Sequence, residues 1–300
     1  MTGTGRVAPI ALGAALLVLA AGCNGGSSGP SSSSTTKAVA VHPARTFPAP
    51  AGLIAAGQPQ PNGTMWLLAG TASAKTISAL DVSTGKLLGT VPVGNAATAL
   101  AELSTGVVVV GTGTATTGSL DLRNGSTGAL VATVAVGAPV RSLAVGADGN
   151  TVYVLDGTAK SESITVVDSQ TRHVVVTLPV SLGTVSIVAD PAQTGVFALS
   201  GGGRVEEVAA AGGKVTTSFP IGQTGRYLAL SSDGTTLYAL KGSGVVRNVA
   251  VVDVATERVT KVVPAPASAL GIVLSPDGNT LYDVVGTPAY GNIQAFSLTG

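Results

Sequence analysis

The sequence is poor in the residues that build disulfides, metal centres and nucleic-acid-binding surfaces. Its 300 residues include one cysteine, Cys23, and two histidines. A single cysteine excludes an internal disulfide, and two histidines leave few ligands for a zinc site. Aromatic residues make up 3% of the chain, charged residues 10%, and the net charge is +1. We therefore expect no nucleic-acid partner, because such binding needs clustered positive charge and stacking rings.

Motifs for catalysis and for phosphate binding are also scarce. His42 and His173 have no neighbouring ligand residues, and we interpret both as surface side chains. Gly201-Gly202-Gly203 lacks the Lys-Ser/Thr ending of a phosphate loop, and no serine stands in a Gly-x-Ser-x-Gly motif. The sequence thus predicts no catalytic residue, no metal site and no cofactor.

Small and aliphatic residues are abundant, and they are arranged in a repeat. Hydrophobic residues make up 45% of the chain and glycine occurs 41 times. A turn-like block recurs about every 43 residues, a period typical of stacked supersecondary units. Its clearest copies are residues 146–153, 231–238 and 275–282. The glycines of the recurring turn are Gly63, Gly106, Gly149, Gly195, Gly234 and Gly278.

Each unit of the repeat has the pattern of four short strands. An Asp-Gly or Asn-Gly pair favours a tight turn because glycine adopts positive φ without steric cost. A second turn contains Thr-Gly, as at Thr84-Gly85 and Thr127-Gly128. The flanking runs, such as 163–168 and 173–178, are rich in β-branched residues. Four-stranded units of this length form β-propellers, so we predict an all-β fold of six blades, with seven as the alternative.

The repeat resembles that of the YVTN-type β-propeller proteins, which are similar to WD40 propellers in architecture. The resemblance lies in the turn 147–149, the segment 153–156 that follows it, the strand 164–168, and the closing pairs Val136-Gly137 and Ile221-Gly222. It covers nearly everything after residue 50. It implies the fold but no particular activity, because propellers host many unrelated functions.

The two ends of the repeat region are expected to meet in one blade. The last unit stops at Phe296-Ser297-Leu298, one strand short. Residues 37–41 have strand character, and we expect them to supply the missing outer strand and close the ring. The alternative is that residues 37–41 are a plain linker.

The N-terminus has the pattern of a bacterial lipoprotein signal. Arg6 precedes an apolar run over residues 7–22, which is short for a membrane-spanning helix. This run ends in Leu-Ala-Ala-Gly directly before Cys23. Residues 1–22 are therefore interpreted as a signal peptide, and Cys23 as the residue that carries lipid. An ordinary secretory signal with an incidental cysteine is the alternative.

The remaining chain divides into a tether and a folded region. Residues 23–36 are rich in Ser, Thr and Gly and are typical of a flexible linker. Residues 37–300 form the predicted propeller. Two or more acyl chains, such as palmitate, give stable membrane attachment. We therefore expect an extracytoplasmic protein that is anchored to the cell membrane through Cys23.

The predicted innermost strands line the central channel and are small and apolar. Glu102 is the only ionisable residue in them, and calcium-dependent propeller lactonases need several carboxylates there. Without a partner, Glu102 is a weak candidate for a catalytic acid. The predicted inner strands are residues 53–56, 99–102, 142–145, 186–189, 228–231 and 271–274.

One face of the predicted propeller is modestly basic and could attract an anionic ligand. The loops expected on this face contain Lys75, Arg141, Lys160, Arg226, Tyr227, Lys241, Arg247 and Tyr290, opposed by Asp156 and Glu162. The candidate ligand-binding residues are Arg141, Arg226, Tyr227, Arg247 and Tyr290.

These patterns favour a cell-envelope lipoprotein whose propeller is a non-enzymatic binding or scaffold module. Its partner would be an envelope glycan, a small ligand or another protein. The alternative is a propeller-type enzyme, such as a lactonase, a lyase or a quinone-dependent dehydrogenase. That alternative requires converging polar side chains at the channel mouth, which the inner strands do not supply.

Overall fold

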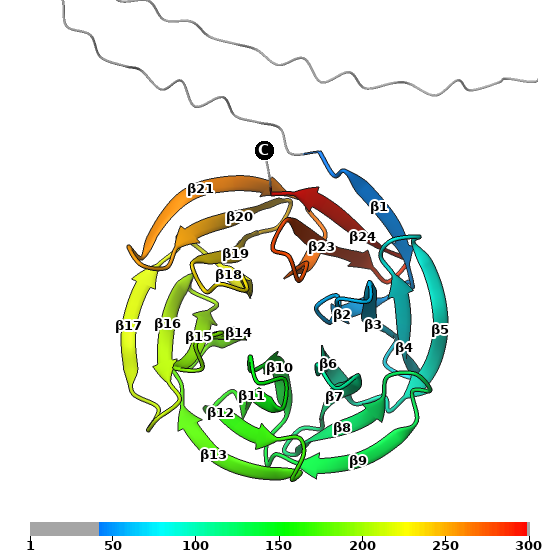
Figure 1. The fold of residues 1–300 in the computed structure, drawn as a ribbon. Coiled ribbons are helices and arrows are strands. Elements are labelled where there is room, and N and C mark those ends of the chain that lie inside the picture. Colours follow the sequence, from blue (N-terminus) through cyan, green and yellow to red (C-terminus); the bar gives the residue numbers. More distant parts are fainter. Residues whose placement is uncertain (1–41, 299–300) are drawn as a thin grey trace, which may run out of the picture. The chain divides into compact units, whose positions relative to one another are not determined.

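The computed structural model describes residues 42–298, and these residues form a six-bladed β-propeller. Each blade is a four-stranded antiparallel sheet, and the blades surround a central channel (Figure 1). The described residues contain no helix. The predicted fold class and blade number are confirmed. Residues 1–36, including Cys23, and the expected strand 37–41 lie outside the described residues.

The first three blades follow one another along the chain, each from its innermost to its outermost strand. Blade 1 consists of β2 (Leu53–Ala56), β3 (Thr64–Gly70), β4 (Lys75–Asp81) and β5 (Lys86–Val93). Blade 2 consists of β6 (Ala97–Glu102), β7 (Val107–Gly113), β8 (Gly118–Asn124) and β9 (Leu130–Ala135). Blade 3 consists of β10 (Val140–Val145), β11 (Thr151–Thr158), β12 (Ser161–Asp168) and β13 (His173–Pro179).

The last three blades continue the series, and the sixth takes its outer strand from the start of the described chain. Blade 4 consists of β14 (Thr184–Ala189), β15 (Gly195–Ser200), β16 (Arg204–Ala209) and β17 (Val215–Pro220). Blade 5 consists of β18 (Gly225–Leu230), β19 (Thr236–Ser243), β20 (Val246–Asp253) and β21 (Arg258–Ala265). Blade 6 consists of β22 (Ala269–Leu274), β23 (Thr280–Thr287), β24 (Tyr290–Ser297) and β1 (Arg45–Ala49).

The recurring turn joins the first and second strands of a blade, and in blades 3, 5 and 6 it contains an Asp-Gly pair. In blade 4 the predicted turn glycine, Gly195, begins β15 instead, and Gln193 adopts the positive φ of the turn, 59°. In blade 3, Gly149 has a φ of 71°, which a residue with a Cβ rarely adopts. Oδ1 of Asp148 accepts hydrogen bonds from the N–H groups of Asn150 and Thr151, both at 2.9 Å. The aspartate thus satisfies backbone donors that the turn would otherwise leave free.

The core lies between neighbouring blades. The second and third strands are buried on both faces, whereas an outer strand such as β5 is largely exposed. Tyr153 and Leu155 of blade 3, for example, pack in one cluster with Ile187 and Val196 of blade 4. Six clusters of this kind pack the blades of the ring together.

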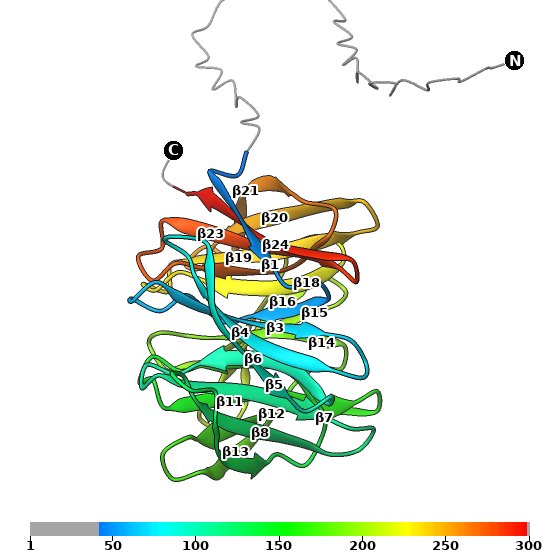
Figure 2. The ribbon, with the colours of Figure 1, turned by 90° about the vertical axis from the view of Figure 1, so that its right-hand side faces the viewer.

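The closing strand is β1, not the predicted segment 37–41. β1 pairs antiparallel with β24 along the outside of blade 6 (Figure 2), with Phe47 opposite Ile293. Phe47 is 3% exposed and supplies the buried anchor that the Ala/Val run at 37–41 lacks. Pro48 is tolerated because an edge strand leaves one side of its backbone unpaired. The idea of closure by an N-terminal strand is confirmed, and its position is corrected.

Every inner strand has an irregular residue at the same place. The pairing between the first and second strands shifts register once in each blade, directly after the first residue of the inner strand. Such irregularities re-aim side chains and are common near functional sites. The skipped residues are Ile54, Thr98, Arg141, Val185, Arg226 and Leu270.

Candidate functional site

The antiparallel blades give the propeller two distinct faces. We call the face with the recurring turns the turn face; it also has the turns between third and fourth strands. The opposite face, here the loop face, has the connections between second and third strands and the links between blades. Because these connections alternate along the chain, the sequence position of a residue fixes the face it belongs to.

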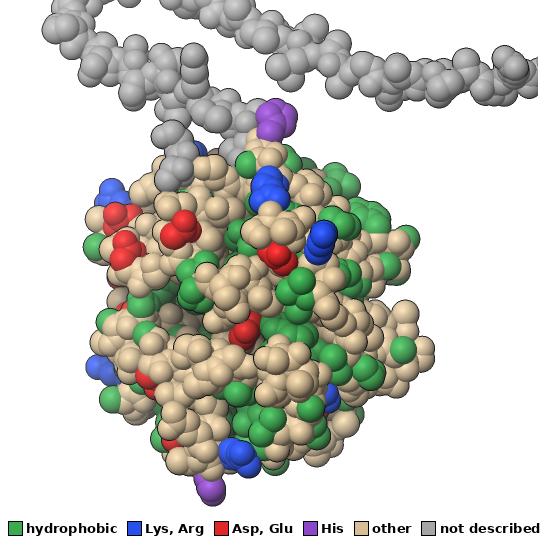
Figure 3. Space-filling view, turned by 45° about the vertical axis from the view of Figure 1, so that its right-hand side comes forward, with side chains coloured by type: hydrophobic (Ala, Val, Ile, Leu, Met, Phe, Trp, Pro, Cys, Tyr) green, Lys and Arg blue, Asp and Glu red, His purple; other side chains and the backbone are tan. Residues whose placement is uncertain are grey.

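Charged side chains are sparse on the side of the ring in Figure 3, where hydrophobic and uncharged polar surface separates them. The loop face nevertheless has an excess of cations. They are Lys75, Arg141, Lys160, Arg204, Arg226, Lys241 and Arg247, and the acidic residues at the same end of the strands are Asp156, Glu162 and Glu206.

Arg141 is neutralised. Its guanidinium forms an ion pair with Glu162, whose other carboxyl oxygen accepts a hydrogen bond from the N–H of Thr184 at 2.9 Å. Arg141 also belongs to inner strand β10 rather than to a loop between blades. The charge of Arg141 is therefore compensated within blade 3 by Glu162 of β12, and a role of Arg141 in ligand binding remains a prediction.

Arg226 and Arg247 form the uncompensated part of the loop face. Arg226 lies at the irregular position of β18 and donates from Nε to the carbonyl oxygen of Gly242 at 2.7 Å. Gly242 is paired with Arg247, which brings the two guanidinium groups together in blade 5. Burial and the nearby Arg226 charge lower the pKa of Arg247. Within residues 42–298, neither arginine forms an ion pair.

Arg247 has donors that nothing satisfies. Its Nε and Nη1 atoms are buried and have no hydrogen-bond partner among the described residues. A buried donor without a partner is unfavourable, and the cost is larger for a charged group. The neighbouring ammonium of Lys241 is engaged with the carbonyl oxygen of Ile221 at 2.8 Å. This corner of blade 5 thus concentrates positive charge and free donors, and its three cations form no ion pair within residues 42–298.

The two tyrosines predicted with these arginines lie elsewhere in the architecture. Tyr227 is on inner strand β18, where its ring packs against Gly271 of blade 6 and lines the channel. The hydroxyl of Tyr290 is 3.0 Å from Oγ of Ser268, in the link between blades 5 and 6. Tyr290 is 46% exposed.

Asp156 does not oppose the cations of the loop face as predicted, because it is buried. Its side chain is 2% exposed and accepts hydrogen bonds from the hydroxyls of Ser163 at 2.8 Å and Thr165 at 3.1 Å. Burial raises its pKa against the effect of these bonds. Asp156 therefore organises blade 3 internally.

The inner strands contain polar residues that the sequence patterns did not single out. Oγ of Ser142 accepts a hydrogen bond from the N–H of Ile187 at 3.4 Å, and Oγ of Ser186 accepts one from the N–H of Leu228 at 3.1 Å. Each bond links an inner strand to the next blade. Small hydroxyl side chains at the same strand position of consecutive repeats were the available signal.

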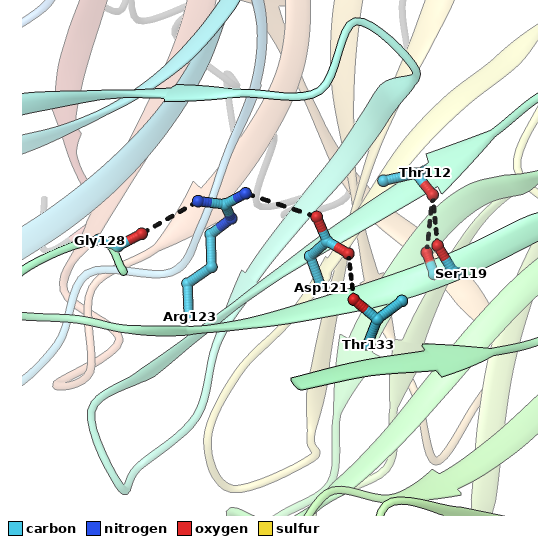
Figure 4. A network of polar contacts seen from close by, with 6 residues as sticks. All are labelled: Thr112, Ser119, Asp121, Arg123, Gly128 and Thr133. Atoms are coloured by element: carbon cyan, nitrogen blue, oxygen red, sulfur yellow. Dashed lines mark hydrogen bonds and ion pairs between the residues drawn. The ribbon is translucent and has the colours of Figure 1, made fainter. Parts of the chain in front are cut away.

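Blade 2 has its own polar network on its outer strands (Figure 4). Asp121 accepts a hydrogen bond from the hydroxyl of Thr133 at 3.0 Å and lies 3.5 Å from Nη2 of Arg123. Arg123 also donates to the carbonyl oxygen of Gly128 at 3.0 Å. Nε of Arg123 is buried without a hydrogen-bond partner among residues 42–298, but the other contacts all lie within blade 2, so we interpret the network as structural.

The histidines stay apart, in agreement with their predicted surface positions. His42 precedes β1, and His173 begins β13. Both are exposed, and Nδ1 of His173 is 2.6 Å from the carbonyl oxygen of Thr171. Within the described part of the chain, no group of three His, Cys, Asp or Glu residues is placed to hold a metal ion. This part also has no helix long and apolar enough to span a membrane.

The central channel contains a cavity of about 380 Å³ on the turn-face side. Its wall consists of inner-strand residues, and its rim consists of the recurring turns. Glu102, at the end of β6, is the only carboxyl among the lining residues. Burial raises the pKa of Glu102 to about 7, and its Oε2 atom is buried without a hydrogen-bond partner among residues 42–298.

A second carboxyl, Asp283, is buried between blades 5 and 6. It is 2% exposed, its Oδ1 atom has no hydrogen-bond partner in the described chain, and burial raises its pKa to about 7. Asp283 lies on β23, opposite Ile272 of β22 on one side and Gln294 of β24 on the other. By register, the equivalent residues in the other blades are Leu67, Val110, Val154, Ala198 and Ala239.

Comparisons with known proteins support the architecture and go no further. No protein-family profile matches the sequence, and no curated protein matches it. Among solved structures, hydrazine synthase from Kuenenia stuttgartiensis is similar with a TM-score of 0.62. The match covers 78% of this chain and 74% of that chain at 18% sequence identity. At this identity the likeness shows the propeller fold alone.

Proposed function

We propose that this protein is a lipid-anchored cell-envelope propeller that binds an anionic ligand without catalysing a reaction. The signal pattern that ends at Cys23 and the linker composition of residues 23–36 support the anchor and its extracytoplasmic location. The uncompensated charge at Arg226 and Arg247 supports the ligand class. The ligand would be an envelope polymer or a partner protein that presents phosphate or carboxylate groups.

The unpartnered Nε and Nη1 atoms of Arg247 are the observation that carries this proposal. Its buried Nε and Nη1 atoms lack acceptors, and the adjacent Arg226 charge disfavours the ionised state of Arg247. A bound anion would satisfy these donors and relieve the repulsion between the two arginines. Guanidinium groups suit this role because their planar fork matches the oxygens of phosphate and carboxylate.

The test compares charge removal at this pair with charge removal elsewhere on the same face. Full-length protein in detergent would be titrated with a teichoic-acid-type polyphosphate, a uronic-acid polymer and a neutral glucan. We expect Arg226→Gln with Arg247→Gln to weaken binding to the preferred polyanion at least tenfold. Arg204→Gln is the matched control, because Nε of Arg204 already bonds to Oγ of Ser218 at 2.6 Å. Equal losses in both variants would refute a specific site.

Membrane attachment is tested separately. A pull-down from solubilised membranes, with Cys23→Ala as the control, would identify co-purifying proteins and glycans. We expect wild type to partition with the membrane and the variant to be released. Release of both forms would contradict the lipid anchor. It would not affect the anion site, which the polyanion titration tests separately.

The enzymatic alternative rests on a different part of the molecule. Glu102 lines the channel cavity with a pKa raised to about 7, which is the range of a general acid or base. A lactonase, lyase or dehydrogenase would also need a second functional group or a cofactor near Glu102. Turnover of a screened substrate that Glu102→Gln abolishes would favour this alternative.

A further inference from the structure

The channel cavity has features of a ligand site that differ from those of the loop face. About 380 Å³ is enough for a small organic molecule, within the range of known ligand pockets. The wall is apolar over most inner strands, with residues such as Leu100, Leu143, Ile187 and Ile272. A ligand with an apolar body would therefore fit this wall.

Glu102 is a negative charge without a counter-charge in this cavity. No lysine, arginine or histidine belongs to the lining residues, and Tyr227 is the other titratable side chain among them. Glu102 takes part in no ion pair of the described chain, and its Oε2 atom receives no hydrogen bond there. The position equivalent to Glu102 is Val145 in blade 3 and Leu230 in blade 5. Packing therefore does not explain a carboxyl at this place.

The mouth of the cavity is also negatively charged. The recurring turns around it contain Asp148, Asp190, Asp233 and Asp277 and no lysine or arginine. Hydrogen bonds from the Ser231 hydroxyl and from Thr235 lower the pKa of Asp233, so its carboxylate is ionised at neutral pH. The pKa of Asp277 is lowered in the same way by Ser275. A cation that approaches the turn face is thus attracted towards the channel.

We propose that the channel binds a small organic ammonium ion, with its apolar body against the inner strands and its charged nitrogen at Glu102. The ligand supplies the positive charge and the donor that the cavity lacks. This site is independent of the anion site at Arg226 and Arg247, because it opens on the opposite face.

The experiment uses ligands of one carbon skeleton with different charges. Full-length protein would be titrated by calorimetry with 4-phenylbutylammonium, with its trimethylammonium analogue and with neutral 4-phenylbutan-1-ol. At pH 8 we expect at least one of the two cations to bind about tenfold or more tightly than the alcohol, a difference typical of one charge-assisted interaction.

The pH dependence identifies Glu102 as the recognising group. Because its carboxyl is half-protonated near pH 7, binding of the cations should weaken about tenfold between pH 8 and pH 6, whereas the alcohol should be indifferent. Burial raises the pKa of Tyr227, which therefore stays neutral over this range, and Asp233 and Asp277 stay ionised.

Glu102→Gln should abolish the preference for the cations and its pH dependence. Glu206→Gln is the matched control; Glu206 belongs to the loop face and accepts a hydrogen bond from Ser181 at 2.7 Å. The Arg226→Gln, Arg247→Gln variant should bind the cations like wild type, which separates the two sites. If neither cation binds better than the alcohol, or if Glu102→Gln retains the preference, the proposal is wrong.

Discussion

Glu102 and Asp283 have nearly the same titration behaviour in very different surroundings. Burial raises the pKa of each carboxyl to about 7, and each has one buried oxygen without a hydrogen-bond partner in the described chain. Glu102 lines a cavity at the channel mouth, whereas Asp283 is 2% exposed and packed between blades 5 and 6. The same perturbation thus marks a candidate ligand site in one region and a stability cost in the other.

The comparison shows that a raised pKa alone does not identify a ligand site. What distinguishes Glu102 from Asp283 is that a cavity adjoins its side chain. Glu102 is half-buried and lines the cavity, so a ligand in the cavity lies next to its side chain. Asp283 can be reached only if blades 5 and 6 separate. Blade 6 is also the blade that lacks a turn before its outer strand, and it alone among the six has no register shift between its outer two strands. We therefore expect destabilising substitutions in blade 6 to lower the stability of the protein most.

The largest effect should come from breaking the closing blade. Phe47→Ala removes the buried anchor of β1 and should lower the free energy of unfolding by about 3–5 kcal/mol. Urea denaturation monitored by circular dichroism would measure it. Pro48→Ala, at the exposed neighbouring position, is the control and should change stability little. A small effect of Phe47→Ala would show that β1 contributes little to closure.

The second-largest effect should come from Asp283, whose burial is expected to lower the free energy of unfolding. A carboxyl with a raised folded-state pKa is protonated in both states below about pH 4, and its cost grows as pH rises towards 7. Asp283→Val should therefore raise stability by up to about 4 kcal/mol at pH 8 and by less at pH 4. Thermal melts at both pH values would measure this.

The reverse substitution in an equivalent blade sharpens the same point. Val154→Asp places a carboxyl at the matching position of blade 3 and should destabilise the protein more at pH 8 than at pH 4. If Asp283→Val lowers stability at pH 8, Asp283 has an interaction that the fold requires, and the contrast with Glu102 disappears.

The smallest effect on stability should come from Glu102. Its side chain is partly solvated, so water screens the charge and reduces the cost of ionisation. Glu102→Gln should therefore raise the free energy of unfolding at pH 8 by less than Asp283→Val does, and the gain should shrink as pH falls below 7, measured by urea denaturation. A gain as large as that of Asp283→Val would place Glu102 in the same structural class as Asp283.

The repeat made the architecture predictable from the sequence. The parts of the fold that do not follow the repeat could not be predicted in the same way. The near-constant spacing of the recurring turn implies six blades, and five of the six predicted turn glycines adopt positive φ. In blade 4 the turn position belongs to Gln193 instead of Gly195. The closing strand was misplaced because an outer edge strand has no repeating signal of its own. Phe47 is the one buried residue of β1, and Arg45 adds a hydrogen bond to the carbonyl oxygen of Ser83 at 2.6 Å.

The candidate sites were predictable only in part, because pairing across strands is invisible in composition. Arg141 and Arg226 occupy equivalent positions, yet Glu162 neutralises only the first of them. The excess of cations on the loop face was correct, but the pairing of Arg226 with Arg247 follows from the register of β19 and β20. Glu102 stood out in the sequence as the one charged residue of the predicted inner strands, whereas the observed inner strands β10 and β18 also contain Arg141 and Arg226. The cavity beside Glu102 could be recognised only in the structure.

The position of β1 has a mechanical consequence. The chain enters the ring through β1, which pairs only with β24. Any pull on the N-terminal side of residue 42 is therefore transmitted first to the bonds between these two strands. If that end is tethered, a pulling force acts first on the hydrogen bonds between β1 and β24. Separation of β1 from β24 would then be the first step in forced unfolding.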